Sequence, residues 1–140
     1  MISFTLSNGI KIIPTSFHGS KFSDGTVFSP SEEEIEQIKA EFACLTVARE
    51  FATKELPIQG ISASTSWSTV TEDGLAKLRQ VQKMNPEAII LVSFMIVDAL
   101  CTMGIKDEFP LVLSTNATPA TTRSAPQDKV WDIGNFSAGR

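Results

Sequence analysis

The single histidine and the two cysteines limit the chemistry that this chain of 140 residues can perform. A zinc site needs three or four Cys, His or carboxylate ligands at workable spacings, and His18, Cys44 and Cys101 are isolated from one another in the sequence. A serine or cysteine nucleophile needs a base beside it, so a hydrolase of that kind would have to use His18. The phosphate-cradling patterns GxGxxG and GxxxxGK[ST] do not occur. We therefore expect no metal and no cofactor, and the sequence favours binding over catalysis.

The polar segment 115–124 is the strongest candidate for a binding site. Asn116, Thr118 and Thr122 offer neutral hydrogen-bond donors and acceptors, and Arg123 offers a planar cation that can grip two phosphate oxygens. The segment contains no acidic residue that would neutralise Arg123 locally. This pattern predicts a site for a small anionic ligand. The alternative is a solvated connection in which Arg123 is paired elsewhere in the fold.

Two further groups of residues can contribute to such a site. Ser93 and Phe94 lie where a predicted strand passes into a predicted helix, and they offer a hydroxyl and an aromatic ring. A second polar group near the N-terminus consists of His18, Ser20, Lys21 and Asp24. The alternative for His18 is an ordinary position in a surface loop.

Periodicity and turn residues divide the chain into strands and helices. The clearest helix is expected over residues 30–55, because Ser29 and Pro30 followed by glutamates form a strong helix start, and apolar residues then recur at three- and four-residue steps as far as Phe51. Further helices are predicted over 71–85 and 94–103. Strands are predicted as a hairpin over 2–13 and at 26–28, 58–67, 88–92, 109–113 and 130–136.

The order of these elements predicts an α/β fold, with α+β as the alternative, in a single domain covering residues 1–140. Strand 88–92, helix 94–103 and strand 109–113 would form a βαβ unit, whose crossover is normally right-handed. The expected sheet is mixed, with an N-terminal hairpin, two main helices and a short third helix. Ligands of such folds bind at the carboxyl ends of the strands, which is where the segment 115–124 begins.

Charge and hydropathy exclude several classes of partner. The 12 basic residues are scattered and outnumbered by 16 acidic ones, which gives a net charge of −4, whereas nucleic-acid binding depends on clustered Lys and Arg. The longest apolar run, 88–97, is too short to cross a bilayer, and the N-terminus lacks the pattern of a signal peptide. We therefore expect a cytoplasmic protein with no general nucleic-acid binding and no membrane association.

The order of three motifs resembles a known family. The first has the form xDGxxFxPS at residues 23–31, the second has the form IILVSxxIxxAL at residues 89–100, and the third is a late Thr-Arg loop. In this order and spacing, over most of its length, the chain is similar to the anti-Thoeris sponges, small phage proteins that sequester cyclic nucleotide immune signals. The N-terminal strand departs from that family because it lacks a histidine–proline pair.

The resemblance implies a non-catalytic protein that holds a cyclic ADP-ribose-like molecule without cleaving it. It also implies a homo-oligomer, with sites often at subunit boundaries. The helix expected over 30–55 is amphipathic and long enough to mediate assembly, and the alternative is that its apolar face serves core packing alone. If the chain is phage-encoded, it would act in the host cytoplasm. The roles that the resemblance implies are phosphate contacts for Arg123 and Lys21, a ribose contact for Asp24, base or ribose contacts for Asn116 and Thr118, and stacking by Phe94 or Phe28.

Three functions thus remain open from the sequence. The first is capture of a small anionic, nucleotide-like ligand. The second is a small hydrolase or phosphodiesterase that uses His18. The third is a structural or protein-interaction subunit with no small ligand.

Overall fold

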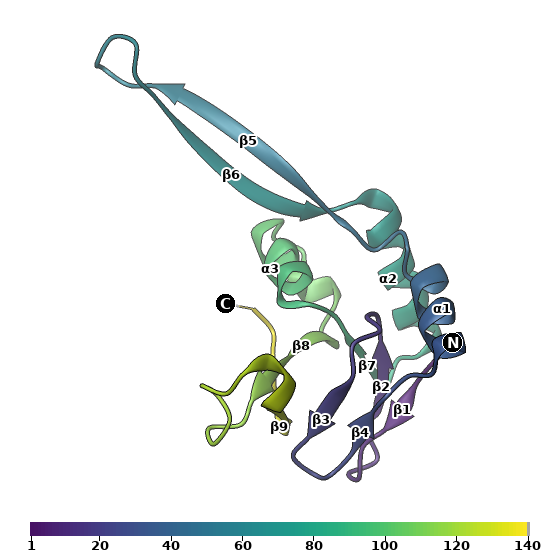
Figure 1. Cartoon of the computed structure of the whole chain (residues 1–140). Coiled ribbons are helices and arrows are strands. Elements are labelled where there is room, and N and C mark those ends of the chain that lie inside the picture. Colours follow the sequence, from purple (N-terminus) through teal and green to yellow (C-terminus); the bar gives the residue numbers. More distant parts are fainter. Residues whose placement is uncertain (140) are drawn as a thin grey trace.

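The computed structural model describes residues 1–139, which are organised around one seven-stranded sheet (Figure 1). The strands are β1 (Phe4–Thr5), β2 (Lys11–Pro14), β3 (Ser20–Phe22), β4 (Val27–Phe28), β5 (Val47–Glu55), β6 (Ser62–Val70), β7 (Ala88–Leu91), β8 (Val112–Ala117) and β9 (Val130–Ser137). The helices are α1 (Glu32–Glu41), α2 (Glu72–Met84) and α3 (Phe94–Thr102), with short 3-10 turns η1 (Lys106–Glu108) and η2 (Pro126–Asp128). The order across the sheet is β1-β2-β7-β8-β9-β3-β4, and β5 pairs only with β6 in a separate ribbon.

The predicted α/β fold is confirmed, and its mixed sheet begins in the predicted N-terminal hairpin. β1 and β2 pair antiparallel around a turn at Asn8-Gly9, where Gly9 has a φ of +84°, a conformation that glycine adopts without steric cost. β2, β7 and β8 run parallel, so β7, α3 and β8 form the predicted βαβ unit. β9 pairs antiparallel with β8 and parallel with β3.

Two hydrophobic cores lie on opposite faces of the sheet. Because successive side chains of a strand point to opposite faces, neighbours such as Ile12 and Ile13 enter different cores. The second core contains Leu6, Ile12, Phe22 and Ile89. The main core lies between the sheet and the three helices, and it includes Ile13, Ile90 and Val112 of the sheet, Ile38 of α1, Leu78 of α2 and Leu100 of α3.

The sheet curls until its two outermost strands meet. The ring of Phe4 in β1 stacks on the ring of Phe28 in β4 with centroids 4.8 Å apart, and it lies 5.6 Å from the ring of Phe22. The turn after β3 adds a polar contact, because the Asp24 carboxylate accepts a hydrogen bond from the Ser7 backbone N–H at 2.7 Å. Within the described residues, ring contacts and this hydrogen bond close the sheet, and no β-ladder joins β1 to β4.

Local signals set the starts of the first two helices. α1 begins with a capping box, in which the Ser31 hydroxyl accepts from the Glu34 N–H and the Glu34 carboxylate accepts from the Ser31 N–H. The predicted cap, Ser29, lies two residues before the true one. α2 begins where predicted, with Thr71 as the cap and its hydroxyl accepting from the Gly74 N–H.

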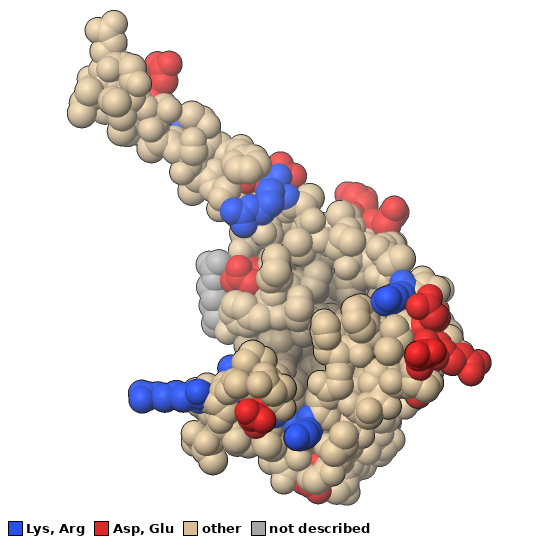
Figure 2. Space-filling model, in the orientation of Figure 1, with Lys and Arg blue, Asp and Glu red and all other residues tan. Residues whose placement is uncertain are grey.

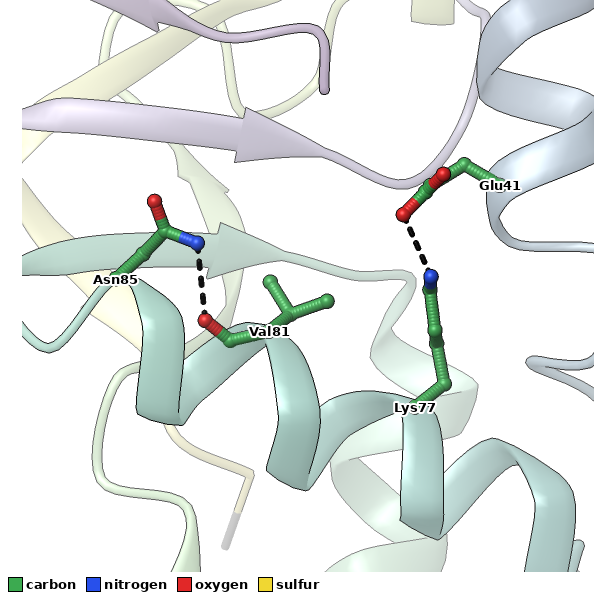
Figure 3. A network of polar contacts seen from close by, with 4 residues as sticks. All are labelled: Glu41, Lys77, Val81 and Asn85. Carbon is green, nitrogen blue, oxygen red and sulfur yellow. Dashed lines mark hydrogen bonds and ion pairs between the residues drawn. The ribbon is translucent and has the colours of Figure 1, made fainter.

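An ion pair between Lys77 and Glu41 joins α2 to the last residue of α1 (Figure 3). The Lys77 ammonium also lies 5.8 Å from the centre of the Phe42 ring, the residue after the helix. At the far end of α2, Asn85 donates from Nδ2 to the Val81 carbonyl (Figure 3). These contacts fix where the chain leaves each helix.

The prediction of one helix over 30–55 is wrong. α1 ends at Glu41, and β5 pairs antiparallel with β6 along its whole length, from Val47 opposite Val70 to Glu55 opposite Ser62. Phe51, which the helical period placed on a buried face, is 70% exposed. The two strands form an arm that projects from the body of the protein (Figure 1). We call residues 47–70 the arm.

This error has a physical cause. Ile38 and Phe42 do keep the helical period, and the Ala, Arg, Glu and Lys content of 47–55 suits a helix. Pairing with the Ser- and Thr-rich β6 overrides that weak preference, because strand formation depends on the neighbouring strand. Pro57, which follows the predicted helix, and Gly60, which has a φ of +78° and falls within the strand predicted over 58–67, both belong to the tip of a hairpin.

The boundaries of two predicted strands also shift. The strand expected over 58–67 begins only at Ser62, because the preceding residues form the tip of the arm. The strand expected over 109–113 begins at Val112 and continues to Ala117, so the start of the predicted loop belongs to the sheet. β9, in contrast, begins at the predicted residue, Val130.

Phe4→Ala should loosen the closure of the sheet. Loss of this half-buried ring and of its stacking on Phe28 should lower the free energy of unfolding by about 2–3 kcal/mol, as measured by urea denaturation. Phe94→Ala is the matched control, because that ring is 54% exposed and its loss should cost less than about 0.5 kcal/mol. Equal effects of the two substitutions would show that the ring contact does not hold the sheet closed.

Candidate functional site

A cleft of about 800 Å³ opens at one end of the curled sheet. Its walls come from the end of β2 and the loop that follows, from β3 and β4, from the junction of β7 with α3, from β8, and from the segment that enters β9. The lining residues are Pro14, Thr15, Ser16, His18, Gly19, Ser20, Lys21, Val27, Phe28, Ser29, Leu91, Val92, Ser93, Thr115, Pro126, Gln127, Lys129 and Trp131.

The cleft lies at the carboxyl ends of the parallel strands β2, β7 and β8, the position expected for an α/β fold. Thr15, the first residue after β2, is anchored to β7 because its N–H and its hydroxyl both donate to the Leu91 carbonyl, at 3.2 and 2.9 Å. The loop 15–19 then connects β2 to β3, although β7, β8 and β9 separate these strands in the sheet. The curl of the sheet brings the end of β2 and the start of β3 within reach of this short loop, and the cleft lies beside it.

The side chains in the cleft lining that carry an ionisable group are all basic. His18 and Lys21 line it on one side and Lys129, which precedes β9, lines it as well, while the lining includes no Asp or Glu. Within residues 1–139 the ion pairs involve other side chains, so the ammonium groups of Lys21 and Lys129 are available to a ligand. Figure 2 shows the surface hollowed beside the lobe that leads from β8 to β9, and this lobe carries an acidic side chain as well as basic ones.

The start of α3 adds hydrogen-bond donors at the same edge. Ser93 is the N-cap residue, but its hydroxyl makes no capping hydrogen bond. The hydroxyl therefore remains free for a ligand in the cleft that it lines. The first N–H groups of a helix carry partial positive charge, so this end of α3 has the same electrostatic sign as the lysines.

Trp131 supplies the aromatic surface of the cleft. It lies in β9 opposite Phe22 of β3 and Ala117 of β8, and it packs half-buried against the second core. Because the ring is supported on the core and also lines the cleft, it offers a rigid surface to a flat ligand ring.

Four of the ten residues predicted to bind ligand line this cleft. Phe28 is among them, but it is 8% exposed and its ring stacks on that of Phe4. The main role of this ring is therefore to close the sheet. Thr115, the first residue of the predicted segment 115–124, also lines the cleft. The four are His18, Lys21, Phe28 and Ser93.

Asp24 lies outside the lining and has a structural role. Its carboxylate accepts hydrogen bonds from the Ser7 N–H at 2.7 Å, the Thr26 N–H at 2.9 Å and the Thr26 hydroxyl at 2.8 Å. The backbone bond from Ser7, followed by that from Thr26, holds the pKa of Asp24 well below its usual range. A carboxylate committed to these donors does not fit the predicted contact with a ribose hydroxyl.

The threonines of the predicted loop bond mainly to one another. The Thr122 hydroxyl donates to the Thr118 carbonyl at 2.9 Å, and the hydroxyls of Thr118 and Thr121 lie 2.9 Å apart. Thr121 also accepts from the Val130 N–H at 3.0 Å. These bonds shape the turn between β8 and β9, and they leave Thr118 and Thr122 outside the cleft lining.

Three further predicted residues also lie outside the lining. The Asn116 side chain donates to the Asn135 carbonyl at 3.5 Å. Phe94, in the first turn of α3, is exposed. Arg123 is exposed and forms no ion pair within the described residues, as its sequence context predicts, but it does not line the cleft. The cation that the sequence selected for the site is therefore not one of the cations in it.

Among the lining residues that sequence reasoning missed, Lys129 and Trp131 supply a charge and an aromatic ring. A single lysine before a strand carries no local signal of function. The alternation around Trp131 does indicate a strand, but it does not show that β9 lies beside β3. Only that long-range pairing brings both residues beside β3, the strand that carries Lys21.

Comparison with protein-family models, with curated proteins and with solved structures finds no match for this chain. Within residues 1–139, no three His, Cys, Asp or Glu side chains are grouped so that they could hold a metal ion. Nor does this part of the chain contain a helix of sufficient length and apolar character to cross a membrane.

Asp24→Asn should destabilise the protein most at neutral pH. Because the pKa of Asp24 is lowered in the folded state, its contribution to stability is complete above its usual pKa of 3.8 and is lost as the pH falls further. We expect the variant to melt a few degrees below the wild type at neutral pH, and the difference to narrow below a pH of about 4. Thermal melts of both proteins from neutral pH to below a pH of about 4 measure this difference in melting temperature.

Asp128→Asn is the control for this experiment. Asp128 is exposed and its carboxylate makes no hydrogen bond or ion pair within the described residues, so its substitution should leave the melting temperature unchanged. A deficit of Asp24→Asn that stayed constant at every pH would contradict the role assigned to the charge of Asp24.

Proposed function

We propose that the cleft captures a small anionic, nucleotide-like ligand and holds it without chemical change. The observation that carries this proposal is the charge of the lining. Two ammonium groups without ion-pair partners and one imidazole line the cleft, and the lining contains no carboxylate to neutralise them. A site of this kind attracts negative charge and disfavours cations.

The size and the neutral groups of the cleft support a ligand of nucleotide dimensions. Its volume of about 800 Å³ lies within the roughly 300–1,000 Å³ that is usual for small-molecule sites. Lys21 and Lys129 would bind phosphate oxygens, and the indole of Trp131 would stack on a base. The hydroxyls of Ser20 and Ser93 would bond to ribose or phosphate oxygens.

The surroundings of His18 favour capture over hydrolysis. A histidine that acts as a general base is usually oriented by a third group, most often a carboxylate. His18 instead has its ring 4.7 Å from that of Phe17, in a tilted contact, and no lining residue of the cleft is an Asp or Glu. The hydrolase that the sequence leaves open therefore has less support than a binding protein.

The ligand class that we propose is a cyclic ADP-ribose-type signal. Its basis is the resemblance of the motif order to the anti-Thoeris sponges, and the cleft offers what capture of such a molecule requires: phosphate contacts, hydroxyl donors and an aromatic surface. In this proposal the chain is a phage-encoded anti-defence protein that acts as a homo-oligomer in the host cytoplasm.

A thermal-shift series tests the ligand class. We expect cyclic ADP-ribose and ADP-ribose to raise the melting temperature, because a ligand that binds only the folded state stabilises it, and we expect uncharged adenosine to have no effect. Mass spectrometry after denaturation should recover the bound ligand intact. Recovery of a cleaved product, abolished by His18→Ala, would establish the hydrolase in place of the capture protein.

The two tryptophans allow binding to be assigned to the cleft. Trp131 lines the cleft and Trp67 lies in the arm. The ligand should therefore change the tryptophan fluorescence of the Trp67→Phe variant, which retains Trp131, but not that of the Trp131→Phe variant, which retains Trp67. In the Trp67→Phe background, Lys129→Ala should weaken binding about tenfold through the loss of a charged contact. Lys83→Ala, at an exposed position near the end of α2, is the control. Unchanged affinity of Lys129→Ala would contradict the assignment.

A further inference from the structure

The arm has no core of its own. Nearly all of its side chains are exposed on both faces, and only its base packs against the body, where α3 contacts both strands. Its tip adds exposed apolar side chains, of which Ile58 is 65% and Ile61 50% exposed. A lone two-stranded ribbon is at best marginally stable in water, so an arm of this length favours a partner.

The charged side chains of β5 have no oppositely charged partner within the described residues. The Arg49 guanidinium reaches only the Ser66 hydroxyl, at 3.0 Å, and the ion pairs of the described residues lie in other elements. β6 contains no charged residue at all. The unpaired set is Arg49, Glu50, Lys54 and Glu55, in which a positive residue precedes a negative one at each end of the strand.

The open edge of β5 has a fixed pattern of backbone groups. The Leu56 N–H donates to the Ile61 carbonyl at 3.0 Å, in register with the β5–β6 ladder. Alternate residues of an antiparallel strand bond to opposite sides, so the even-numbered residues of β5 bond to β6. The odd-numbered residues from 49 to 55 therefore direct their N–H and carbonyl groups to the open edge.

One antiparallel pairing of two β5 strands satisfies both patterns. With a two-fold axis at Ala52, Arg49 lies opposite Glu55 of the second copy, and Glu50 lies opposite Lys54. Odd-numbered residues then face odd-numbered residues, so the backbone groups at the two open edges meet. Side chains directly opposite each other have Cβ atoms about 5 Å apart on the same face of the sheet, which is close enough for these ion pairs.

Neighbouring registers lose the ion pairs. A shift of two residues in one direction places Arg49 opposite Thr53 and Glu50 opposite Ala52. The same shift in the other direction places Arg49 opposite Pro57 and Lys54 opposite Ala52. A shift of one residue would place open-edge backbone groups opposite groups already bonded to β6. The charge order of β5 therefore selects one register.

We propose that β5 pairs antiparallel with β5 of a second copy of this chain, about a two-fold axis at Ala52. The two arms then form one four-stranded sheet in the order β6-β5-β5-β6, with the two bodies at opposite ends. The interface is isologous, as in most homodimers, and it uses strand addition at an open edge. No lining residue of the cleft belongs to the arm, so this dimer is independent of the proposed ligand.

Sedimentation of the full chain over a wide range of concentrations tests the pairing. The wild type should approach twice the 15.2 kDa of one chain as its concentration rises. Glu50→Lys places like charges opposite each other at both symmetry-related positions, and so does Lys54→Glu. Each substitution alone should therefore raise the dimer dissociation constant by about tenfold or more.

An equal mixture of the two variants gives the decisive result. In a mixed dimer each substituted side chain faces an opposite charge, so dimers should return, and the double variant Glu50→Lys with Lys54→Glu should dimerise by itself. Circular dichroism shows whether each variant is folded. The controls Lys83→Glu and Glu87→Lys alter exposed charges outside the arm and should dimerise as the wild type does.

Three results would overturn the pairing. The first is a wild-type protein that stays monomeric at every concentration. A wild-type protein that binds a different protein but never a second copy of itself counts as this result too. The second is a dimer that neither single substitution weakens, which would place the interface elsewhere. The third is a mixture of the single variants that remains monomeric, which would exclude this register.

Discussion

The stacking of Phe4 on Phe28 is the contact on which the rest of the structure depends, because it joins the two outermost strands of the sheet. Once they are joined, the second core is enclosed on the inner face, and one end of the curled sheet is left open as the cleft. The same strands in a flat sheet would expose Ile12 to water and would carry β3 away from the end of β2. Asp24 reinforces the closure with a charge that is committed to backbone donors.

Much of the fold could be predicted because its signals are local. The hairpin over 2–13, the start of the helix predicted over 71–85 and the aliphatic strand predicted over 88–92 each depend on a few neighbouring residues, and the structure confirms all three. The prediction of a helix over 30–55 is wrong in its second half because strand formation depends on the neighbouring strand. Nothing within 47–55 reveals that β6 lies beside it, and the helical preference of its residues is small compared with a complete ladder.

The site could also be predicted only in part. Residues marked by local patterns could be found, whereas residues placed by long-range strand pairing could not. Ser93 follows from the rule that ligands bind at the carboxyl edge of parallel strands, and Lys21 belongs to the polar group selected near the N-terminus; both line the cleft. The choice of Arg123 rested on the composition of its segment and on the position of that segment after a predicted strand, but the threonines around it use their hydroxyls to shape a turn. Lys129 and Trp131 reach the cleft only through the pairing of β9 with β3, which no local pattern marks.

The chain enters and leaves the arm at neighbouring points, since the Thr71 N–H donates to the Thr46 carbonyl at 3.1 Å. The arm is therefore topologically a long insertion between α1 and α2. In related chains it could be shortened, lengthened or deleted without rerouting the backbone of the body. Because side chains alternate with a period of two, a change in its length that removes or adds two residues per strand would keep each remaining side chain on its own face. The length of the arm can thus vary in evolution while the body and its cleft stay constant.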